Sequence, residues 1–319
     1  MKRLFIFGDP HSFFDSLMTA LDEKGYDRND PDHILVSLGD LCDRGEQSEE
    51  ILEFINSIPK DRKICIAGNH ECLMERMIRR GVPTPHDIHN CTLQTAEQLT
   101  GETGDEAVLQ MQFCDLWNEY RKDWVWYAEL NDMIFVHGWI PCDTVRTKRG
   151  LVLDASYRSD WRESKASDFE QATWINGMNA WYLGIREPGK SIYCGHWHTS
   201  WGHANLRNDG KEFLDKVETY HTREDGTVWP YARFDPFEDE GIVAVDACTV
   251  VSGKVNVVVR EVDDIDDLTA VKYEHLWGSA RKCMIMISVT SGSISKDAER
   301  FLGKKCHLKN QLGWRRMTN

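Results

Sequence analysis

Seven short apolar runs recur along the chain. They are rich in β-branched residues, most end at a glycine, and each has a length of about 4–8 residues, which is typical of buried strands. The predicted strands are 2–8, 33–39, 62–68, 133–138, 191–195, 241–246 and 254–261.

Two amphipathic stretches lie between the first three predicted strands. Their apolar stripes are Phe14, Leu17, Met18 and Leu21 in 13–24, and Ile51, Leu52 and Ile55 in 47–58. Such stripes predict helices that pack on a sheet. Strands that alternate with helices predict an α/β fold, at least through residue 80.

Three later segments break this alternation. Residues 78–127 are polar and predicted to be mostly helical, and 143–190 have no strong strand signal. We interpret both as insertions or a helical and loop cap over the sheet. Residues 207–240 are rich in charge, glycine and proline, and predict a long loop of the kind that often serves function.

Charge is distributed unevenly over the 319 residues. The net charge is −14, yet residues 271–319 contain ten Lys or Arg against three Asp or Glu, so 1–270 carry −21. The acid excess argues against membranes and nucleic acid as partners, except for nucleic acid at the basic tail. We therefore predict a catalytic domain over 1–262 and a basic extension of unknown role over 263–319.

The ten cysteines contain no C-x-x-C pair, and several lie inside apolar runs. The N-terminal apolar stretch is also too short for a signal peptide. Reduced thiols and a cytoplasmic location are therefore predicted. No apolar run reaches the roughly 18 residues of a membrane span.

Acidic, amide or imidazole side chains directly follow five of the predicted strands. The candidate metal ligands at these strand ends are Asp9, His11, Asp40, Asn69, His137, His196 and His198. A lone histidine or Gly-Asp pair after a strand is ordinarily just a turn. Five in order predict one metal site, because ligands of α/β sheets bind at the carboxyl ends of strands.

The ligand types constrain the metal. Mixed carboxylate, imidazole and amide donors suit Mn, Fe or Zn better than an all-oxygen Mg or Ca cage. Seven donors exceed the needs of one ion and would hold two if a carboxylate bridges them, a site suited to phosphoryl chemistry. We expect two metal ions, with Mn²⁺ effective in vitro and Fe or Zn as alternatives.

The motifs Gly39-Asp40-Leu41-Cys42-Asp43-Arg44-Gly45 and Gly68-Asn69-His70-Glu71 resemble those of the calcineurin-like metallophosphoesterases. Within them the chain is similar to the PPP-type serine/threonine protein phosphatases, particularly the phage and bacterial branch typified by the bacteriophage lambda phosphatase. The symmetrical diadenosine tetraphosphate hydrolases are similar too. The resemblance implies a β-sandwich flanked by helices, an αββα arrangement.

The resemblance also implies roles. Asp9 and His11 would bind the first metal, Asp40 would bridge, and Asn69, His137 and His196 would complete the second, while His198 matches a further superfamily ligand. His70 would be the general acid, oriented by Asp43, and Arg44 would clamp phosphate. For a second phosphate-binding arginine we choose Arg162, with Arg158 as the competitor.

Two departures from the family pattern bear on the substrate. Ser12 stands where the family usually has glycine, and we expect it to cap the following helix. Trp139 stands where the protein phosphatases usually have a second glycine. Nine of the twelve tryptophans lie between Trp117 and Trp201; core packing explains most of them, and Trp197 is a candidate substrate-binding residue.

The expected reaction is direct attack of a metal-bridging hydroxide on a phosphomonoester. A phosphorylated serine or threonine of a protein is the first expected substrate; a dinucleotide polyphosphate or another small phosphoester is the alternative. A non-catalytic scaffold on this fold is the third possibility. The presence of the ligands and of His70 argues against it. The sequence does not indicate an oligomeric state.

Overall fold

Two β-sheets face each other at the centre of the computed structural model, which describes residues 1–147, 150–153, 156–213, 220–222 and 228–273. The four-stranded sheet has the order β13-β1-β2-β3, and the six-stranded sheet has the order β11-β12-β8-β5-β4-β14. The strands of the first sheet are β1 (Lys2–Phe7), β2 (His33–Ser37), β3 (Lys63–Cys65) and β13 (Val257–Val262). Those of the second are β4 (Val125–Leu130), β5 (Met133–Phe135), β8 (Ser191–Cys194), β11 (Phe237–Asp239), β12 (Ile242–Ala244) and β14 (Thr269–Lys272).

Alternate residues of the strands enter two separate cores. Leu4 and Ile6 of β1 pack with Phe135 of β5 and Val243 of β12 between the sheets. The intervening residues, such as Phe5, face outward and pack under helices. Successive side chains of a strand point to opposite faces of the sheet. Because both faces are buried here, successive residues of these strands are apolar. The predicted α/β sandwich flanked by helices is therefore confirmed.

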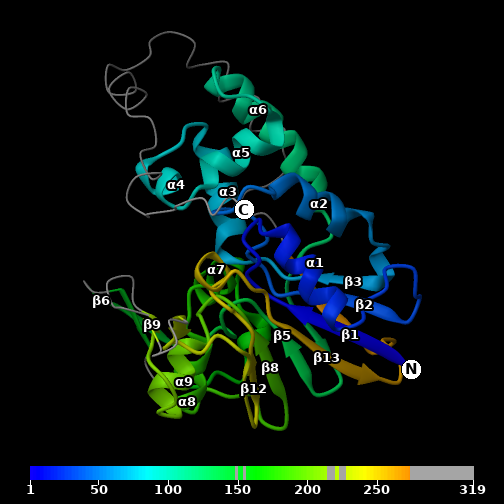
Figure 1. Ribbon diagram of the computed structural model, residues 1–319, viewed down its shortest axis with the longest axis vertical. Helices are drawn as coiled ribbons and strands as arrows, with labels where there is room; N and C mark the ends of the chain where they lie inside the picture. Colours follow the sequence, from blue (N-terminus) through cyan, green and yellow to red (C-terminus); the bar gives the residue numbers. More distant parts are fainter. Residues whose placement is uncertain (148–149, 154–155, 214–219, 223–227, 274–319) are drawn as a thin grey trace. The chain divides into compact units, whose positions relative to one another are not determined.

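Helices cover the outer faces of the sheets. The elements are α1 (Phe14–Glu23), α2 (Ser48–Ser57), α7 (Ala166–Ala172), α8 (Gly177–Tyr182), α9 (Ser200–Leu206) and α10 (Thr249–Ser252), with 3-10 turns η1 (Lys60–Arg62) and η2 (Trp161–Glu163). Leu17 and Leu21 of α1 and Ile51 and Ile55 of α2 are buried, as the apolar stripes predict. Figure 1 shows α1 and α2 beside the β1-β2-β3 sheet, with α8 and α9 beside β8 and β12.

The predicted helical insertion is present between β3 and β4. It consists of α3 (Asn69–Arg80), α4 (Pro85–His89), α5 (Thr92–Thr100) and α6 (Glu106–Tyr120). Phe113 and Trp117 of α6 are buried in the same core that lies under α1 and α2. The insertion therefore shares the main core of the molecule.

Several strands differ from the sequence prediction. β4 lies at the end of the segment predicted to be helical; all six of its residues are buried, so it has no period-2 signal. The segments predicted as cap and loop contain hairpins, β6 (Thr144–Thr147) with β7 (Gly150–Leu153) and β9 (Tyr220–Thr222) with β10 (Val228–Pro230). β14 pairs with β4, so the sheet continues past residue 262.

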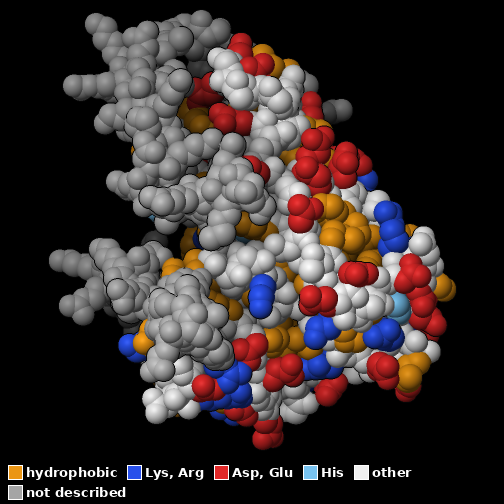
Figure 2. All heavy atoms as spheres, viewed as in Figure 1, with side chains coloured by type: hydrophobic (Ala, Val, Ile, Leu, Met, Phe, Trp, Pro, Cys, Tyr) orange, Lys and Arg blue, Asp and Glu red, His pale blue; other side chains and the backbone are white. Residues whose placement is uncertain are grey.

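One compact unit spans Met1–Leu276. Residues 274–319, which include most of the predicted basic extension, lie outside the described part of the chain. Figure 2 shows acidic side chains over much of the surface facing the viewer, in keeping with the net acid excess. Within the described residues, no helix has both the length and the apolar character to cross a membrane.

Candidate metal centre

The predicted ligands lie in turns at the carboxyl ends of β1, β2, β5 and β8 and at the start of α3, which follows β3. Besides Ser12, six non-glycine residues of these turns have a positive φ, a backbone region that non-glycine residues seldom occupy. They are Asp9 (55°), His11 (48°), Asp40 (52°), Asp43 (71°), Arg44 (68°) and His196 (66°). Strained backbone of this kind gathers at functional sites because the surrounding fold must hold it in place.

Two glycines let the chain pass close to the carboxylates. A Cβ at Gly195 would overlap Oδ2 of Asp9, and one at Gly68 would overlap Oδ1 of Asp40. Ser12 also has a positive φ, of 61°, which explains why glycine suits this position. The prediction that Ser12 caps α1 is wrong, because its Oγ lies 2.7 Å from Oγ of Ser48, and the backbone N–H of Asp15 in the first turn of α1 donates to Oε1 of Gln47 at 3.2 Å instead.

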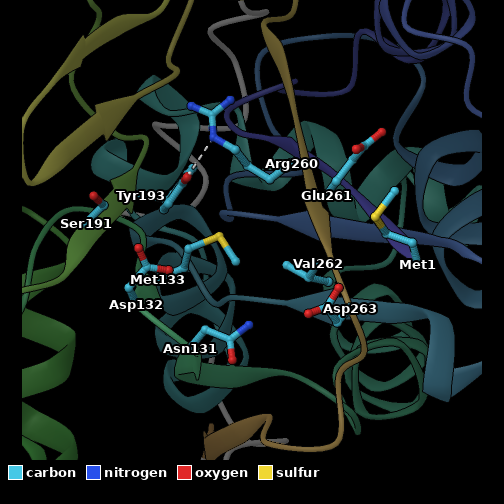
Figure 3. Close-up of a pocket in the computed structure, with 10 residues that line it drawn as sticks. All are labelled: Met1, Asn131, Asp132, Met133, Ser191, Tyr193, Arg260, Glu261, Val262 and Asp263. Carbon is cyan, nitrogen blue, oxygen red and sulfur yellow. Dashed lines mark hydrogen bonds between the residues drawn. The ribbon is translucent and has the colours of Figure 1, made fainter.

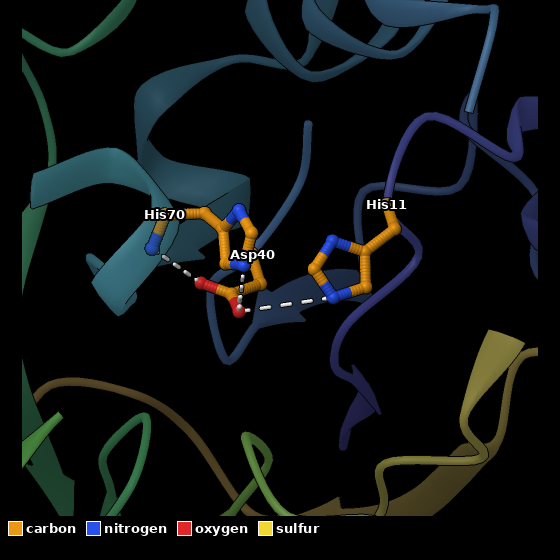
Figure 4. Close-up of side chains that lie close together, drawn as sticks. All are labelled: His11, Asp40 and His70. Atoms are coloured by element: carbon orange, nitrogen blue, oxygen red, sulfur yellow. Dashed lines mark hydrogen bonds and ion pairs between the residues drawn. The ribbon is translucent and has the colours of Figure 1, made fainter. Parts of the chain in front are cut away.

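Asp40 lies at the middle of the cluster. Its Oδ2 is 3.8 Å from Nε2 of His11 and 4.0 Å from Nε2 of His70, as Figure 4 shows. Its Oδ1 lies 3.3 Å from Nε2 of His137 and accepts a hydrogen bond from the backbone N–H of His70 at 2.9 Å. Asp40 thus belongs to two groups of potential ligands, one with His11 and His70 and one with His137 and His196. One carboxylate oxygen facing each group is the arrangement expected of a bridging ligand.

Two histidines turn their Nε2 toward Asp40. Nδ1 of His11 donates to the carbonyl of Cys42 at 3.0 Å, and Nδ1 of His137 donates to the carbonyl of Leu38 at 2.7 Å. A carbonyl can only accept, so each Nδ1 holds a proton and Nε2 is the ring nitrogen left to bind a metal ion. Metal-binding histidines are commonly oriented by such a bond from the other ring nitrogen.

The centre contains acceptors that lack donors. Oδ2 of Asp9 is buried without a hydrogen-bond partner among the described residues, while its Oδ1 accepts from the backbone N–H of His196 at 2.9 Å. Nε2 of His137 faces both Oδ1 of Asn69, at 2.8 Å, and Oδ1 of Asp40. Lone pairs that converge in a buried space need a cation between them. The residues therefore fit bound metal ions.

The pKa shifts agree with this need for positive charge. Burial, then the nearby charge of Asp246, raises the pKa of Asp9 well above its usual range. Burial opposes protonation of His137, but the charge of Asp40 and its hydrogen bond overcome that effect and raise the pKa of His137 to about 10. A proton there takes the place that a metal would fill.

The proton-donor pair predicted from the resemblance is assembled beside Asp40. Nδ1 of His70 lies 2.6 Å from Oδ2 of Asp43, and both side chains are buried. Nη2 of Arg44 donates to Nε2 of His70 at 3.1 Å. Arg44 is exposed, so its guanidinium can turn from His70 toward a phosphate.

Sequence reasoning missed residues that support these turns. Oε2 of Glu71 accepts from the backbone N–H of Asp40 at 2.9 Å and of Gly68 at 2.7 Å, and Oε1 accepts from Leu41 N–H at 2.9 Å. Burial, then the charge of Asp40, raises the pKa of Glu71 to about 7. Glu71 belongs to the motif Gly68-Asn69-His70-Glu71, and its place beside Asn69 and His70 was the sequence signal that could have identified it. Asp246, buried close to Asp9, ends the predicted strand 241–246, and that position was its available signal.

His198 and Trp197 lie beside the centre. Nδ1 of His198 is 2.8 Å from Oγ of Ser200, and its ring stacks on that of Trp197. Neither group of potential ligands contains His198, so its role as a ligand stays a prediction. Trp174, which sequence reasoning did not single out, lies edge-on to His196 with ring centroids 5.8 Å apart. Trp117, Trp124, Trp139 and Trp161 are buried in the core, as the core-packing interpretation expects.

Arg162 is bound by two glutamates, which argues against the expectation that it clamps phosphate. Its Nε donates to Oε1 of Glu129 at 2.5 Å, and its Nη2 donates to Glu129 and Glu187 at 3.0 Å each. Glu129 also accepts from Nζ of Lys190 at 2.7 Å. Lys190 directly precedes β8, and Glu129 pairs with Ile134 near the start of β5. His196 and His137 follow the carboxyl ends of the same two strands. The partners of Arg162 and the predicted ligands therefore lie at opposite ends of these strands.

We call this group the Glu129 cluster: Glu129, Tyr157, Trp161, Arg162, Glu187 and Lys190. Spacing in a charged segment could not distinguish a phosphate ligand from an ion-paired arginine. The competitor Arg158 is partly exposed, and its Nε lies 3.3 Å from Oδ1 of Asp160.

A cavity of about 400 Å³ lies away from the metal centre. Its walls include Met1, Met133 and Ser191, which stand at or just before the starts of β1, β5 and β8, so it opens at the ends of the strands opposite to the ligands (Figure 3). Nε of Arg260 in its wall donates to the hydroxyl of Tyr193 at 2.9 Å, as drawn there. The lining side chains are mixed in charge, and we assign the cavity no role.

Comparison with known proteins defines the class. Residues 2–200 match the family of calcineurin-like phosphoesterases, and this match covers more than half of the chain. The chain therefore belongs to the calcineurin-like phosphoesterase family, whose members are metal-dependent hydrolases.

Two bacterial relatives share part of the sequence. An asymmetrical bis(5'-nucleosyl)-tetraphosphatase PrpE of Halalkalibacterium halodurans is 32% identical over 115 residues, which is 34% of this chain and 46% of the relative. A symmetrical bis(5'-nucleosyl)-tetraphosphatase of Buchnera aphidicola is 38% identical over 71 residues, or 22% of this chain and 24% of the relative. The chain thus spans less than half the length of these relatives.

Solved structures are similar at a lower level. A protein serine/threonine phosphatase from Saccharomyces cerevisiae, with similarity to human phosphatase PP5, has a TM-score of 0.38 and 14% identity, covering 83% of this chain and 82% of that one. Among the described cysteines, Cys42, Cys65, Cys72, Cys142 and Cys194 are free, buried thiols.

Proposed function

We propose that the chain hydrolyses phosphomonoesters with a dinuclear metal centre, and that phosphorylated serine or threonine of a protein is its substrate. The observation that carries this proposal is the pair of His70 and Asp43, held at 2.6 Å beside Asp40. Serine and threonine alkoxides are poor leaving groups. A positioned proton donor is therefore most valuable for them.

Each residue has a separate task. Asp9, His11, Asp40, Asn69, His137 and His196 would hold the two metals, with Mn²⁺, Fe or Zn as the candidates and His198 as a further ligand. Two bound metals polarise the phosphoryl oxygens and lower the pKa of a water between them. Arg44 binds a phosphoryl oxygen by its planar fork. His70 gives the proton on Nε2 to the ester oxygen, while Asp43 keeps its hold on Nδ1.

Arg44 and His70 must separate for this step. Nη2 of Arg44 donates to Nε2 of His70, so this nitrogen holds no proton in that arrangement. When Arg44 turns to a phosphate, Nε2 is freed to take up a proton from water, and this is the proton that the leaving group needs. Substrate binding and readiness of the acid are thereby connected. We also propose that the protein is cytoplasmic. Within the family, we propose that it belongs to the branch of the bacteriophage lambda phosphatase.

A dinucleotide polyphosphate is the second candidate substrate. The two bacterial relatives support it, because both are named as bis(5'-nucleosyl)-tetraphosphatases. The half-buried rings of Trp174 and Trp197 beside His196 would suit the stacking of a base.

A substrate panel tests the proposal. We would measure kcat/KM of one Mn²⁺-loaded preparation on a phosphoserine peptide, para-nitrophenyl phosphate and diadenosine tetraphosphate. The phosphopeptide is expected to be hydrolysed with the highest kcat/KM. A preference for the dinucleotide by orders of magnitude would refute the first candidate and support the second. Inactivity on all three, with the metals bound, would refute both.

A further inference from the structure

Two buried threonines of α5 hold the carboxylate of Asp43. Oγ1 of Thr95 donates to Oδ1 of Asp43 at 2.7 Å, and Oγ1 of Thr92 donates to Oδ2 at 2.9 Å. The backbone N–H of Asp43 also donates to Oγ1 of Thr95, at 3.1 Å. Both threonines are essentially inaccessible to solvent. A buried hydroxyl without a partner is costly, so these two are retained in the core by their bonds to Asp43.

A third residue continues the stripe. Nε2 of Gln98 donates to the carbonyl of Gly45 at 3.1 Å, and its Oε1 accepts from Oγ of Ser48 at 2.5 Å. Residues three apart lie along one face of a helix, so positions 92, 95 and 98 form one polar face. The side chains of this face form hydrogen bonds with residues 43–48, the segment that contains Asp43 and Arg44. Ala96 and Leu99 of the same helix pack in the main core and fix its position.

Oδ2 of Asp43 receives two hydrogen bonds at once, from Thr92 and from Nδ1 of His70. Among the described residues, the carboxylate's hydrogen bonds come from these two groups and Thr95. The terminal torsion of an aspartate is broad, so a carboxylate without such donors can rotate. Rotation would carry the acceptor of His70 away and release the imidazole ring.

We propose that Thr92 and Thr95 are positioning residues for proton donation by His70, and that the helical insertion completes the catalytic site through α5. The inference rests on the proposed function for its kinetic part. The proton leaves Nε2 of His70 for the ester oxygen, and Asp43 stays ionised throughout. The threonine protons do not move. The hydroxyls only fix the acceptor that orients the ring.

The variants Thr92→Val and Thr95→Val, alone and together, remove the hydroxyls and keep the shape of the side chains. Thr92→Ser and Thr95→Ser keep the hydroxyls and lose a methyl group. Thr100→Val is the matched control, because Oγ1 of Thr100 donates at 2.7 Å to the carbonyl of Ala96 within α5 itself. Metal content and Tm are measured for every variant.

Two Mn²⁺-dependent reactions separate positioning from general damage. Hydrolysis of a phosphoserine peptide needs a proton donor, whereas 2,4-dinitrophenyl phosphate has a leaving group that needs almost none. We expect Thr92→Val/Thr95→Val to lower kcat on the phosphopeptide by about 10- to 100-fold, part of what a general acid supplies. On the dinitrophenyl ester kcat should fall less than about 3-fold, since proton transfer contributes little there. The serine variants and Thr100→Val should match the wild type on both.

Equal losses on the two substrates, or serine variants as impaired as valine variants, would overturn the inference. The single valine variants decide the matter if the double variant does not fold. Proton NMR provides a readout without substrate. The downfield resonance of the Nδ1–H of His70, identified by its absence in His70→Asn, should shift in Thr92→Val and stay in place in Thr100→Val. An unmoved resonance refutes the inference, whereas failure of the wild type to hydrolyse phosphopeptide refutes only the proposed function.

Discussion

The metal centre and the Glu129 cluster are both dense groups of charged residues, but only one is complete by itself. In the Glu129 cluster, Arg162 and Lys190 donate to Glu129, and Arg162 donates also to Glu187. In the metal centre, Oδ2 of Asp9 has no partner among the described residues, and Nε2 of His137 faces two oxygens. A group whose charges already match stabilises the fold. A group that still needs cations is suited to bind metal ions.

Backbone conformation separates the two regions as well. The ligand turns include several non-glycine residues with positive φ, whereas Glu129 lies within the regular strand β4. Strain of about 1–3 kcal/mol per residue persists only where the surroundings enforce it. Stability is thus given up at the metal centre and not at the Glu129 cluster.

The largest expected difference between variants of the metal centre and variants of the Glu129 cluster is in kcat. His70→Asn should lower kcat on a phosphoserine peptide by about 10²- to 10⁴-fold, because it removes the proposed proton donor. Metal content, measured by mass spectrometry, should be unchanged. Loss of metal together with activity would show His70 to be a ligand instead, since its Nε2 lies 4.0 Å from Oδ2 of Asp40. Glu129→Gln, the control from the other cluster, should keep kcat.

The next largest difference is expected between two arginine variants, one beside the metal centre and one in the Glu129 cluster. Arg44→Ala should lower kcat/KM on the phosphopeptide by about 10- to 100-fold, equivalent to one charge-assisted hydrogen bond of about 1.5–3 kcal/mol. Arg162→Ala should change kcat/KM less than about 2-fold, because Glu129 and Glu187 already bind its guanidinium. A comparable loss of kcat/KM in both variants would restore Arg162 as a phosphate ligand.

The two clusters also show how far the sequence could predict the molecule. All seven predicted strands and the two helices beside them are present, because punctuating glycines and apolar stripes are local signals. The gathering of Asp9, Asp40, His137 and the other turn residues was predicted for the same reason. The ion pairs of Arg162 were not predicted, because its partners Glu129 and Glu187 are distant in the sequence and only the fold brings them together. Thr92 and Thr95 were missed because they lie 49 and 52 residues from Asp43.

Metal removal should weaken one cluster only. With free Mn²⁺ at about 100 times its Kd, binding adds about 2.7 kcal/mol to the free energy of unfolding, so a chelator should lower Tm measurably. Asp9→Asn removes a buried charge without a partner on Oδ2, so the chelator-treated variant should be as stable as the chelator-treated wild type or more so. In Mn²⁺ it should gain less stability than the wild type. A chelator effect on Tm as large in Asp9→Asn as in the wild type would contradict this assignment.

The smallest effect expected is the pH dependence of the Glu129 cluster. Burial raises the pKa of Glu129, but the hydrogen bonds and charges of Arg162 and Lys190 outweigh it, so its pKa in the folded protein is lowered. A lowered carboxyl pKa adds stability above the unfolded pKa of about 4.3, and that stability is lost as the pH falls through the folded value. At pH 7, with a chelator present, we expect Glu129→Gln to be less stable than the wild type by about 1 kcal/mol. The difference is small because the ion pairs of Glu129 with Arg162 and Lys190 are partly exposed to solvent. Urea unfolding at a series of pH values should show this gap closing below about pH 4. A gap that is constant from pH 7 to pH 3 would mean that Glu129 stabilises the fold by packing and not by its charge.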